Sequence, residues 1–433
     1  MESIWEQNAV RTSFKAQDGN KSTDVLIIGG GIAGLLCAYK LKSAGVDFIL
    51  TEAREILSGT TKNTTAKISV GQGLIYDKLI RRFGEDKAKL YLNSQIEACK
   101  EYSRLSKAVD CDYEIKDSYV YSLGGKDKLL KEISALRRLG LNAELAATPA
   151  LPIDTAGAVL VKNQAEFNPL KFLYKISERL PIYEHTKVQG LKQDIAVTNH
   201  GEIRFKRLIV ATHFPFINKH GGYFLKLYQH RSYVIAIKGV SDVGGIYIDE
   251  SDTGLSFRNY KDILLLGGGG HRTGKQGGAW RELEAFAKKH YKGAKIVGKW
   301  AAQDCMTLDE IPYVGKYSKA TPNIFVATGF NKWGMTNAMA AANILTDLII
   351  GNKSPYEKLF SPSRSIFRPQ LAANIGESFV GLITPTAPRC PHLGCALKYN
   401  KEEHSWDCPC HGSRFTEDGE LIDNPATDDK KNL

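Results

Sequence analysis

The chain has 433 residues, 43% of them hydrophobic, a length that suits two or three domains with a sizeable core. A net charge of +11 favours encounter with an acidic partner, although a basic, lysine-rich surface would give the same excess. Nucleic acid is disfavoured because no basic-aromatic cluster accompanies the charge. No apolar stretch is long enough for a membrane span, and residues 1–24 lack a signal-peptide hydrophobic region, so we expect a cytoplasmic protein.

The first predicted elements form a dinucleotide-binding unit. Residues 24–28 are typical of a buried parallel strand and run into the glycine-rich turn 29–34 (GGGIAG). A helix to about residue 44 and a strand over 46–50 follow. Glycines in this turn let the backbone approach a pyrophosphate, and the acidic residue after the second strand binds ribose hydroxyls. The predicted cofactor contacts are Gly29, Gly31, Ile32, Ala33, Gly34, Glu52 and Ala53.

Three later segments resemble the D-amino-acid oxidase-like family of FAD enzymes, which includes glycine and sarcosine oxidases. They are the loop 58–67 (SGTTKNTTAK), the strand and turn 208–212 (LIVAT), and the strand, loop and helix 323–350. The resemblance covers about residues 20–362 and implies FAD, with the last helix directed at the flavin ring. The contacts that it implies are Thr60, Thr61, Thr64, Thr65, Ala66, Val188, Ala211, Thr212, Gly329, Trp333, Gly334, Met335 and Thr336.

The expected architecture is α/β plus α+β. Residues 1–362 would form a Rossmann-type FAD-binding domain (about 20–85, 180–215 and 295–352) interleaved with an antiparallel-sheet substrate domain (about 86–179 and 216–294). Helical spacing over 86–109 and 127–139, and strands over 232–238, 245–248 and 263–266, support the second domain. The glycines at 267–270 predict a strand end close to the ring. Residues 353–369, with three prolines and four serines, predict a linker.

The last 44 residues contain two boxes rich in cysteine and histidine, 390–395 (CPHLGC) and 408–413 (CPCHGS). Their ligand pattern is C-x-H, fifteen residues, then C-x-x-H. This pattern suits a 2Fe–2S cluster with Cys390 and Cys408 on one iron and His392 and His411 on the other. A structural zinc site is the alternative, but it has no use for two further cysteines.

Both boxes resemble Rieske proteins, and the subset of the oxidase family with a Rieske appendage resembles the whole chain. The resemblance implies a disulfide between Cys395 and Cys410; two free thiols are the alternative. Ser413 stands where respiratory Rieske proteins place a hydroxyl near a cluster sulfur, whereas Phe415 replaces their tyrosine, so we expect a lower potential. Residues 363–433 are too few for the usual base domain, so we expect a trimmed, small all-β module that relies on the flavin domain for burial.

The substrate side is less defined. Amino-acid oxidases of the family carry W-x-x-x-R-P, whose arginine binds the substrate carboxylate; here Asp304 follows Trp300 at the arginine position. A carboxylate there attracts an ammonium group, although a structural role for Asp304 is equally consistent. The other catalytic candidates are His271, Tyr247 and Trp333. Residues that could line the pocket or contact the cofactor are Arg258, Tyr260, Arg272 and Lys332, and the spacing around Cys305 does not match relatives with covalent flavin.

These elements together predict a two-cofactor oxidoreductase, most simply a dehydrogenase acting on CH–NH donors. FAD would take a hydride from a small amine or amino-acid-like donor, and the cluster would relay single electrons to an acidic carrier of ferredoxin or flavodoxin type. One alternative is a reductase with electrons entering at the cluster. Another is a redox sensor or assembly protein without turnover.

Overall fold

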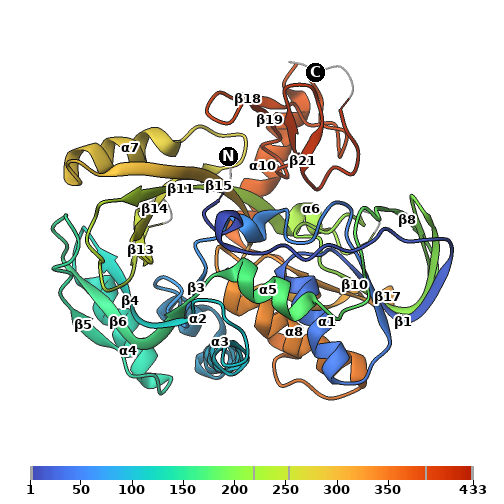
Figure 1. The fold of residues 1–433 in the computed structure, drawn as a ribbon, viewed down its shortest axis with the longest axis horizontal. Helices are drawn as coiled ribbons and strands as arrows, with labels where there is room; N and C mark the ends of the chain where they lie inside the picture. Colours follow the sequence, from blue (N-terminus) through green and yellow to red (C-terminus); the bar gives the residue numbers. More distant parts are fainter. Residues whose placement is uncertain (1–2, 218–219, 252–253, 386–387, 431–433) are drawn as a thin grey trace.

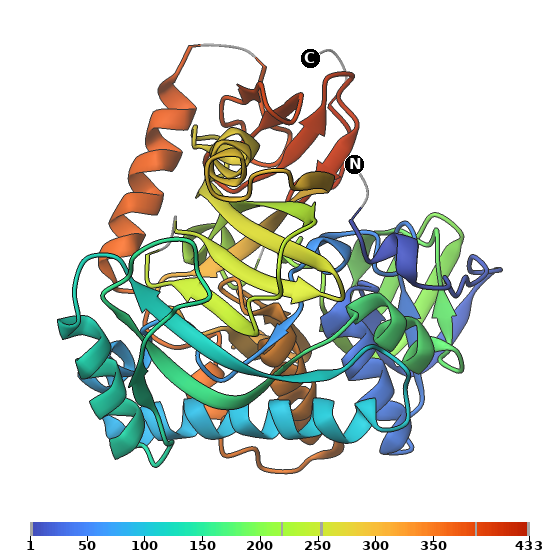
Figure 2. The same cartoon turned by 60° about the vertical axis from the view of Figure 1, so that its left-hand side comes forward.

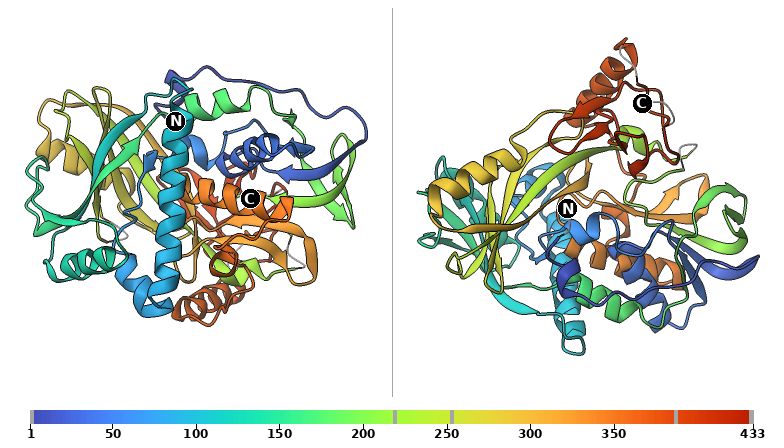
Figure 3. Two further views of the ribbon diagram at one scale, coloured as in Figure 1. Left: turned by 90° about the horizontal axis from the view of Figure 1, so that it is seen from below. Right: turned by 45° about the horizontal axis from the view of Figure 1, so that its top comes forward.

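The computed structural model describes residues 3–217, 220–251, 254–385 and 388–430. Two large sheets stand side by side, and a small C-terminal module lies over the region where they meet (Figure 1, and Figure 3, right). Among the described residues, no helix has the length and apolar character needed to cross a bilayer. The predicted mixture of a Rossmann-type part, an antiparallel-sheet part and a small C-terminal β module is confirmed.

The first sheet has eight strands around a parallel centre. Its main order is β16 (Tyr313–Ser318), β17 (Thr321–Thr328), β10 (Gly201–Val210), β1 (Lys21–Ile28), β2 (Phe48–Thr51) and β7 (Ile182–Tyr183), with β8 (Val188–Lys192) and β9 (Ile195–Thr198) as a hairpin beside β10. Strand β1 is parallel to both β10 and β2, as the dinucleotide-binding unit requires. Helices α1 (Ile32–Ser43) and α8 (Gly334–Ile350) pack against each other and bury most of their residues, because both sequences are apolar around most of the helix.

The second sheet has nine strands, mostly antiparallel. Its main order is β15 (Lys295–Thr307), β11 (Leu227–Lys238), β14 (Ile263–Arg272), β13 (Ser256–Tyr260), β12 (Gly245–Asp249), β4 (Glu114–Ser122), β6 (Gly157–Glu166) and β3 (Lys67–Ile68), with β5 (Glu144–Ala146) beside β6. The helices near it are α2 (Tyr76–Phe83), α3 (Glu85–Ser106), α4 (Asp127–Arg138) and α7 (Ala279–His290). The long helix α3 lies against α8 and so joins the two parts (Figure 2).

The structure corrects two local predictions in this sheet. Residues 295–307 were expected in the FAD-binding part, but β15 pairs along its whole length with β11 in the second sheet. Strand β14 does not end at Leu266; it continues through the glycines to Arg272 because β11 supplies a partner along that length.

The C-terminal module contains one helix and four short antiparallel strands. They are α10 (Pro369–Ile383), β18 (Lys398–Asn400), β19 (Ser405–Asp407), β20 (Arg414–Thr416) and β21 (Leu421–Asp423). The sequence predicted only loops and strands here, and it predicted a linker over 353–369, where the short helix α9 (Glu357–Phe360) forms. The sequence analysis did not predict helix α10, and the apolar residues of this helix are mostly exposed.

A buried ionic network joins the module to the second sheet. Glu403 lies at its centre: Arg231 of β11 donates to its Oε1 at 2.9 Å, and Arg414 donates to its Oε2 at 2.8 Å. Arg414 also pairs with Asp407 at 2.9 Å and Asp423 at 3.1 Å. Burial opposes ionisation of Glu403, but the two arginines outweigh it and hold the pKa of this carboxyl at about 2.

Replacing Glu403 with Ala should lower the free energy of unfolding by about 3–5 kcal/mol, because two buried guanidinium groups lose their shared partner. Urea unfolding followed by circular dichroism measures this. Glu402→Ala is the matched control, since Glu402 pairs at the surface with an Arg281 that is 74% exposed, and its loss should cost about 0–1 kcal/mol. The difference in free energy of unfolding between the two variants should be largest above the pKa of about 4.3 that a glutamate has in the unfolded chain. It should shrink as the pH falls toward 2, because Glu403 then becomes protonated in the folded protein. Equal losses at pH 7 would contradict this account.

Candidate functional site

A cavity of about 680 Å³ runs between the two large sheets. Most of the residues predicted to contact the cofactor line it, although they come from segments far apart in the chain. They are Gly29, Gly31, Ile32, Ala33, Glu52, Ala53, Thr60, Thr61, Thr64, Thr65, Val188, Ala211, Thr212, Gly329, Trp333, Gly334 and Met335. Three predicted contacts, Gly34, Ala66 and Thr336, are buried behind the lining.

The glycine-rich turn fits a bound pyrophosphate. Gly29 has φ +111°, and a Cβ on it would lie 2.6 Å from the carbonyl oxygen of Ala211. A Cβ on Gly34 would lie 1.9 Å from the oxygen of Gly29, so this glycine serves the close packing of helix on strand. Gly31 lines the cavity directly and precedes the first residue of α1, so the N-terminus of the helix faces a space in which phosphates would be stabilised.

Glu52 lines the cavity, and the dinucleotide-binding motif leads us to expect the ribose beside it. Its Oε2 accepts a hydrogen bond from Gly30 N at 2.7 Å and its Oε1 accepts one from Arg54 N at 2.9 Å. Burial raises the pKa of this carboxyl, and the backbone donors oppose the rise. The end of the cavity marked by Glu52 is called the adenosine end below.

Asp304 lines the same cavity and belongs to β15. Burial raises the pKa of its carboxyl, and the charges of Lys332 and His213 oppose the rise. Trp333 also lines the cavity, as predicted. The remaining catalytic candidates do not: the His271 ring bonds Tyr233 Oη at 2.9 Å, and Tyr247 stacks on Tyr119 with ring centroids 4.5 Å apart.

Sequence reasoning missed Lys67, which lines the cavity at the start of β3. Burial lowers the pKa of its ammonium to about 7; Arg258 adds to this effect and Glu166 opposes it. The only sequence signal was its place at the end of the predicted cofactor loop. Its surroundings come from β6 and β13, which are distant in the chain.

The two cysteine- and histidine-rich boxes lie together in the C-terminal module. The rings of His392 and His411 are 4.9 Å apart, and Cys390 and Cys408 are buried in the same small cluster of side chains. His411 is buried, and neither of its ring nitrogens has a hydrogen-bond partner among the described residues. Buried, unsatisfied imidazole nitrogens beside thiols fit a metal cluster, because ligation would satisfy them.

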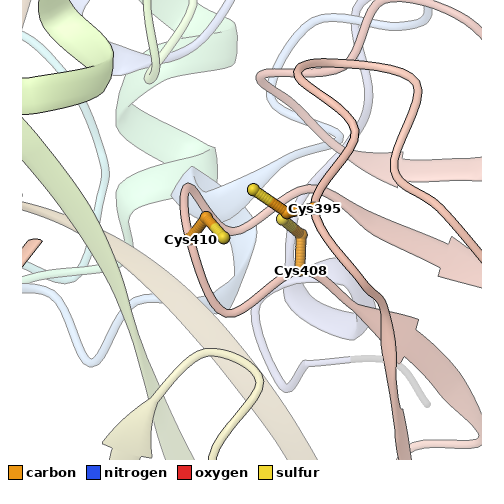
Figure 4. A group of neighbouring side chains, drawn as sticks. All are labelled: Cys395, Cys408 and Cys410. Carbon is orange, nitrogen blue, oxygen red and sulfur yellow. The ribbon is translucent and has the colours of Figure 1, made fainter. Parts of the chain in front are cut away.

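Three sulfur atoms come within 4.8 Å of one another, those of Cys395, Cys408 and Cys410 (Figure 4). Cys395 and Cys410 are unbonded thiols in this structure, so the expected disulfide is not formed in it, although the two sulfurs are neighbours. Ser413 and Phe415 are both fully buried in this region. The lower redox potential expected from Phe415 stays a prediction.

The second box is joined to the cavity wall by Gln303 of β15. The Gln303 side chain donates from Nε2 to the carbonyl oxygen of Gly412 at 2.8 Å, one residue after His411. The main-chain oxygen of Gln303 accepts a hydrogen bond from the Thr60 hydroxyl at 3.1 Å, and Thr60 lines the cavity. Arg272, expected near the flavin, instead donates toward the carbonyl oxygen of Pro409 at 3.4 Å, in the same box.

Comparison with known proteins agrees with this geometry. The family profile described as FAD dependent oxidoreductase matches residues 24–348, and that of the Rieske [2Fe-2S] domain matches residues 379–433. A Bacillus subtilis (strain 168) protein, YhfW, described as a Rieske 2Fe-2S iron-sulfur protein, is 32% identical over 98% of this chain and 96% of its own. The gamma-glutamylputrescine oxidoreductase of Escherichia coli (strain K12) is 23% identical over 79% of this chain and 87% of its own.

Solved structures show the same fold for the flavoprotein part. The glycine oxidase of Geobacillus kaustophilus superposes with a TM-score of 0.68 at 16% identity, covering 80% of this chain and 100% of that one. The L-proline dehydrogenase of P. horikoshii gives 0.67 at 17% identity, covering 80% and 98%.

Asp304→Asn should raise the melting temperature at pH 7, because a carboxyl whose pKa is raised on folding loses stability when it ionises. The sign follows from protonation. Below the unfolded-state pKa of about 3.9, Asp304 is protonated in both the folded and the unfolded state, so its ionisation costs no stability. The stability lost through ionisation grows as the pH rises through the pKa of the folded state. Differential scanning calorimetry should therefore show that the difference in melting temperature between Asp304→Asn and the unaltered protein widens from pH 4 to pH 8. A constant gap would mean that the ionisation of Asp304 is not its source.

Proposed function

Because this chain belongs to the FAD dependent oxidoreductase family and carries a Rieske [2Fe-2S] domain at its C-terminal end, we propose that it oxidises a small amine or amino-acid-like donor and passes the electrons singly to an external carrier. Bound FAD supplies two-electron chemistry and a Rieske cluster supplies one-electron transfer. We place the division between the two parts at about residue 362, with the interleaved FAD and substrate portions given above except that residues 295–307 belong to the second sheet.

The link through Gln303 is the observation that carries the proposal. One residue contacts both the cofactor loop at Thr60 and the second cluster box at Gly412. Gln303 is itself buried, so water does not separate the two sites at this point. A sensor without turnover would have no need for charged groups in the cavity, whereas Asp304 and Lys332 both line it.

Asp304 is assigned to recognition of the donor nitrogen. Its carboxylate lines the cavity where the family's amino-acid oxidases carry an arginine, and a negative charge there attracts an ammonium group and repels a carboxylate. Gamma-glutamylputrescine, the compound named in one relative, contains an amine and suits this assignment. Donors named in the structural neighbours, such as glycine and L-proline, are the amino-acid alternatives.

Cys390, Cys408, His392 and His411 are assigned as the cluster ligands, and Cys395 with Cys410 as a supporting pair. The unsatisfied nitrogens of His411 support the histidine ligands, and the burial of Cys390 and Cys408 in one cluster of side chains supports the thiolate pair. The external carrier is assigned as an acidic protein of ferredoxin or flavodoxin type, on the grounds of the net charge of +11.

Anaerobic mixing with candidate amines and amino acids tests the function. A true donor should bleach the flavin band and then produce the electron paramagnetic resonance signal of a reduced Rieske cluster. Asp304→Asn should lower kcat/KM for an amine by roughly 30-fold or more, since a buried charge loses its partner. Asp262→Asn, at an exposed position, is the matched control. Unchanged amine turnover in Asp304→Asn would remove Asp304 from donor recognition.

Serine substitutions separate the two sets of cysteines. Cys390→Ser and Cys408→Ser should each abolish the iron and acid-labile sulfide of the purified protein, because a thiolate ligand is lost. Cys395→Ser and Cys410→Ser should retain the cluster while lowering its resistance to heat. Iron and sulfide analysis provides the measurement. If Cys395→Ser lost its iron as completely as Cys408→Ser, the proposed ligand set would be wrong. The three neighbouring sulfur atoms of Figure 4 would then be the favoured ligands.

A further inference from the structure

The closing segment of the chain, residues 421–429, lies against the adenosine end of the cavity. It begins with β21 and continues through Asn424 to Asp429. The members of this segment that line the cavity are Leu421, Ile422, Asp423, Asn424, Ala426, Thr427 and Asp429. The wall of a cavity formed mainly by the flavoprotein part is therefore completed by residues of the cluster-binding module.

Three contacts fix the segment to the flavoprotein part, each next to a predicted FAD contact. Arg54, two residues after Glu52, donates to the carbonyl oxygen of Ile422 at 3.4 Å. Lys187, adjacent to Val188, pairs with Asp428 at 3.5 Å and also donates to the carbonyl oxygen of Thr427.

Asn424 makes the third and most extensive contact. Its amide nitrogen donates to the carbonyl oxygen of Thr212 at 2.6 Å and to that of Phe214 at 2.7 Å. Thr212 belongs to the turn after β10 that lines the cavity. The Asn424 side chain therefore bonds the backbone of a turn that is predicted to bind FAD.

The same segment is also tied to the cluster-binding box. The Ser413 hydroxyl accepts a hydrogen bond from Ala426 N at 3.0 Å, and Ser413 is the last residue of the box 408–413. Strand β21 pairs with β20 directly after the box, and Arg414 of β20 holds Asp423 at 3.1 Å. The position of residues 421–429 therefore depends on the conformation of the box that binds the cluster.

We propose that residues 421–429 form part of the FAD-binding site and that FAD and the iron–sulfur cluster stabilise each other's binding through this segment. An ordered cluster box holds the segment in place, and the placed segment completes the adenosine end. Coupling between two binding sites is reciprocal in free energy, so bound FAD must favour the cluster-loaded protein at equilibrium as much as the cluster favours FAD binding. We expect this stabilisation to slow the loss of the cluster. The inference rests on the two cofactors alone and is independent of the donor and of the direction of electron flow.

FAD affinity of the cluster-loaded protein tests the proposal. Protein purified without oxygen is freed of FAD, checked for iron and sulfide, and titrated with FAD while flavin fluorescence is followed. Asn424→Ala should weaken FAD binding about tenfold, because the segment loses two hydrogen bonds to the turn at Thr212. Asn352→Ala, the same substitution at an exposed position that follows α8, should bind FAD as the unaltered protein does.

The reciprocal measurement is the rate at which a chelator bleaches the cluster, with and without saturating FAD. FAD should slow bleaching in the unaltered protein and in Asn352→Ala, and much less in Asn424→Ala. Equal FAD affinities in the two variants, or no protection of the cluster by FAD in the unaltered protein, would overturn the proposal. If Asn424→Ala is purified without its cluster, the rate of bleaching of the unaltered protein with and without FAD still tests whether FAD protects the cluster. Neither measurement requires turnover, so failure to find a donor leaves the outcome unaffected.

Discussion

The close packing of the second cluster box on strands β11 and β15 is the constraint from which the arrangement of the two cofactor sites follows. Gly412 has φ +89°, and a Cβ at this position would lie 2.2 Å from Cγ of Gln229. Only glycine lets the box approach this closely, and the approach brings the Gly412 carbonyl within hydrogen-bond distance of Gln303. Because β15 also forms part of the cavity wall, the sheet on this side of the cavity supports the cluster as well.

This packing also explains how so small a module holds its shape. Its apolar core is limited to a few side chains, chiefly the four cysteines of the two boxes with Leu397, Phe415 and Ala426. A core of that size offers little stability alone. The module instead shares a buried network with β11, in which Arg231 and Arg414 are at most 5% exposed and meet Glu403. Buried ion pairs add little net stability but tolerate few alternative geometries, so the network fixes where the module docks.

How much the sequence could predict depends on how local each feature is. The glycine-rich turn, Glu52 and the cysteine and histidine boxes are short motifs whose chemistry demands particular residues at particular spacings, and the structure gathers them as expected. The pairing of β15 with β11, the surroundings of Lys67 and the placement of residues 421–429 depend on contacts between distant segments. No local pattern encodes those contacts. His271 and Tyr247 were candidates because of their chemical type and their place in or after predicted strands. In the structure His271 bonds Tyr233 and Tyr247 stacks on Tyr119, and neither candidate lines the cavity.

The titratable groups that line the cavity are suited to proton transfer, which must accompany oxidation of an amine. A donor amine delivers hydride only as the neutral amine, so its ammonium form must first lose a proton. Burial raises the pKa of Asp304 and lowers that of Lys67 to about 7. An amine with a pKa near 7 can accept a proton at neutral pH, as a general base must. Two surface residues of the same types would keep their ordinary pKa values and lack this property, so the enclosure formed by the two sheets creates it.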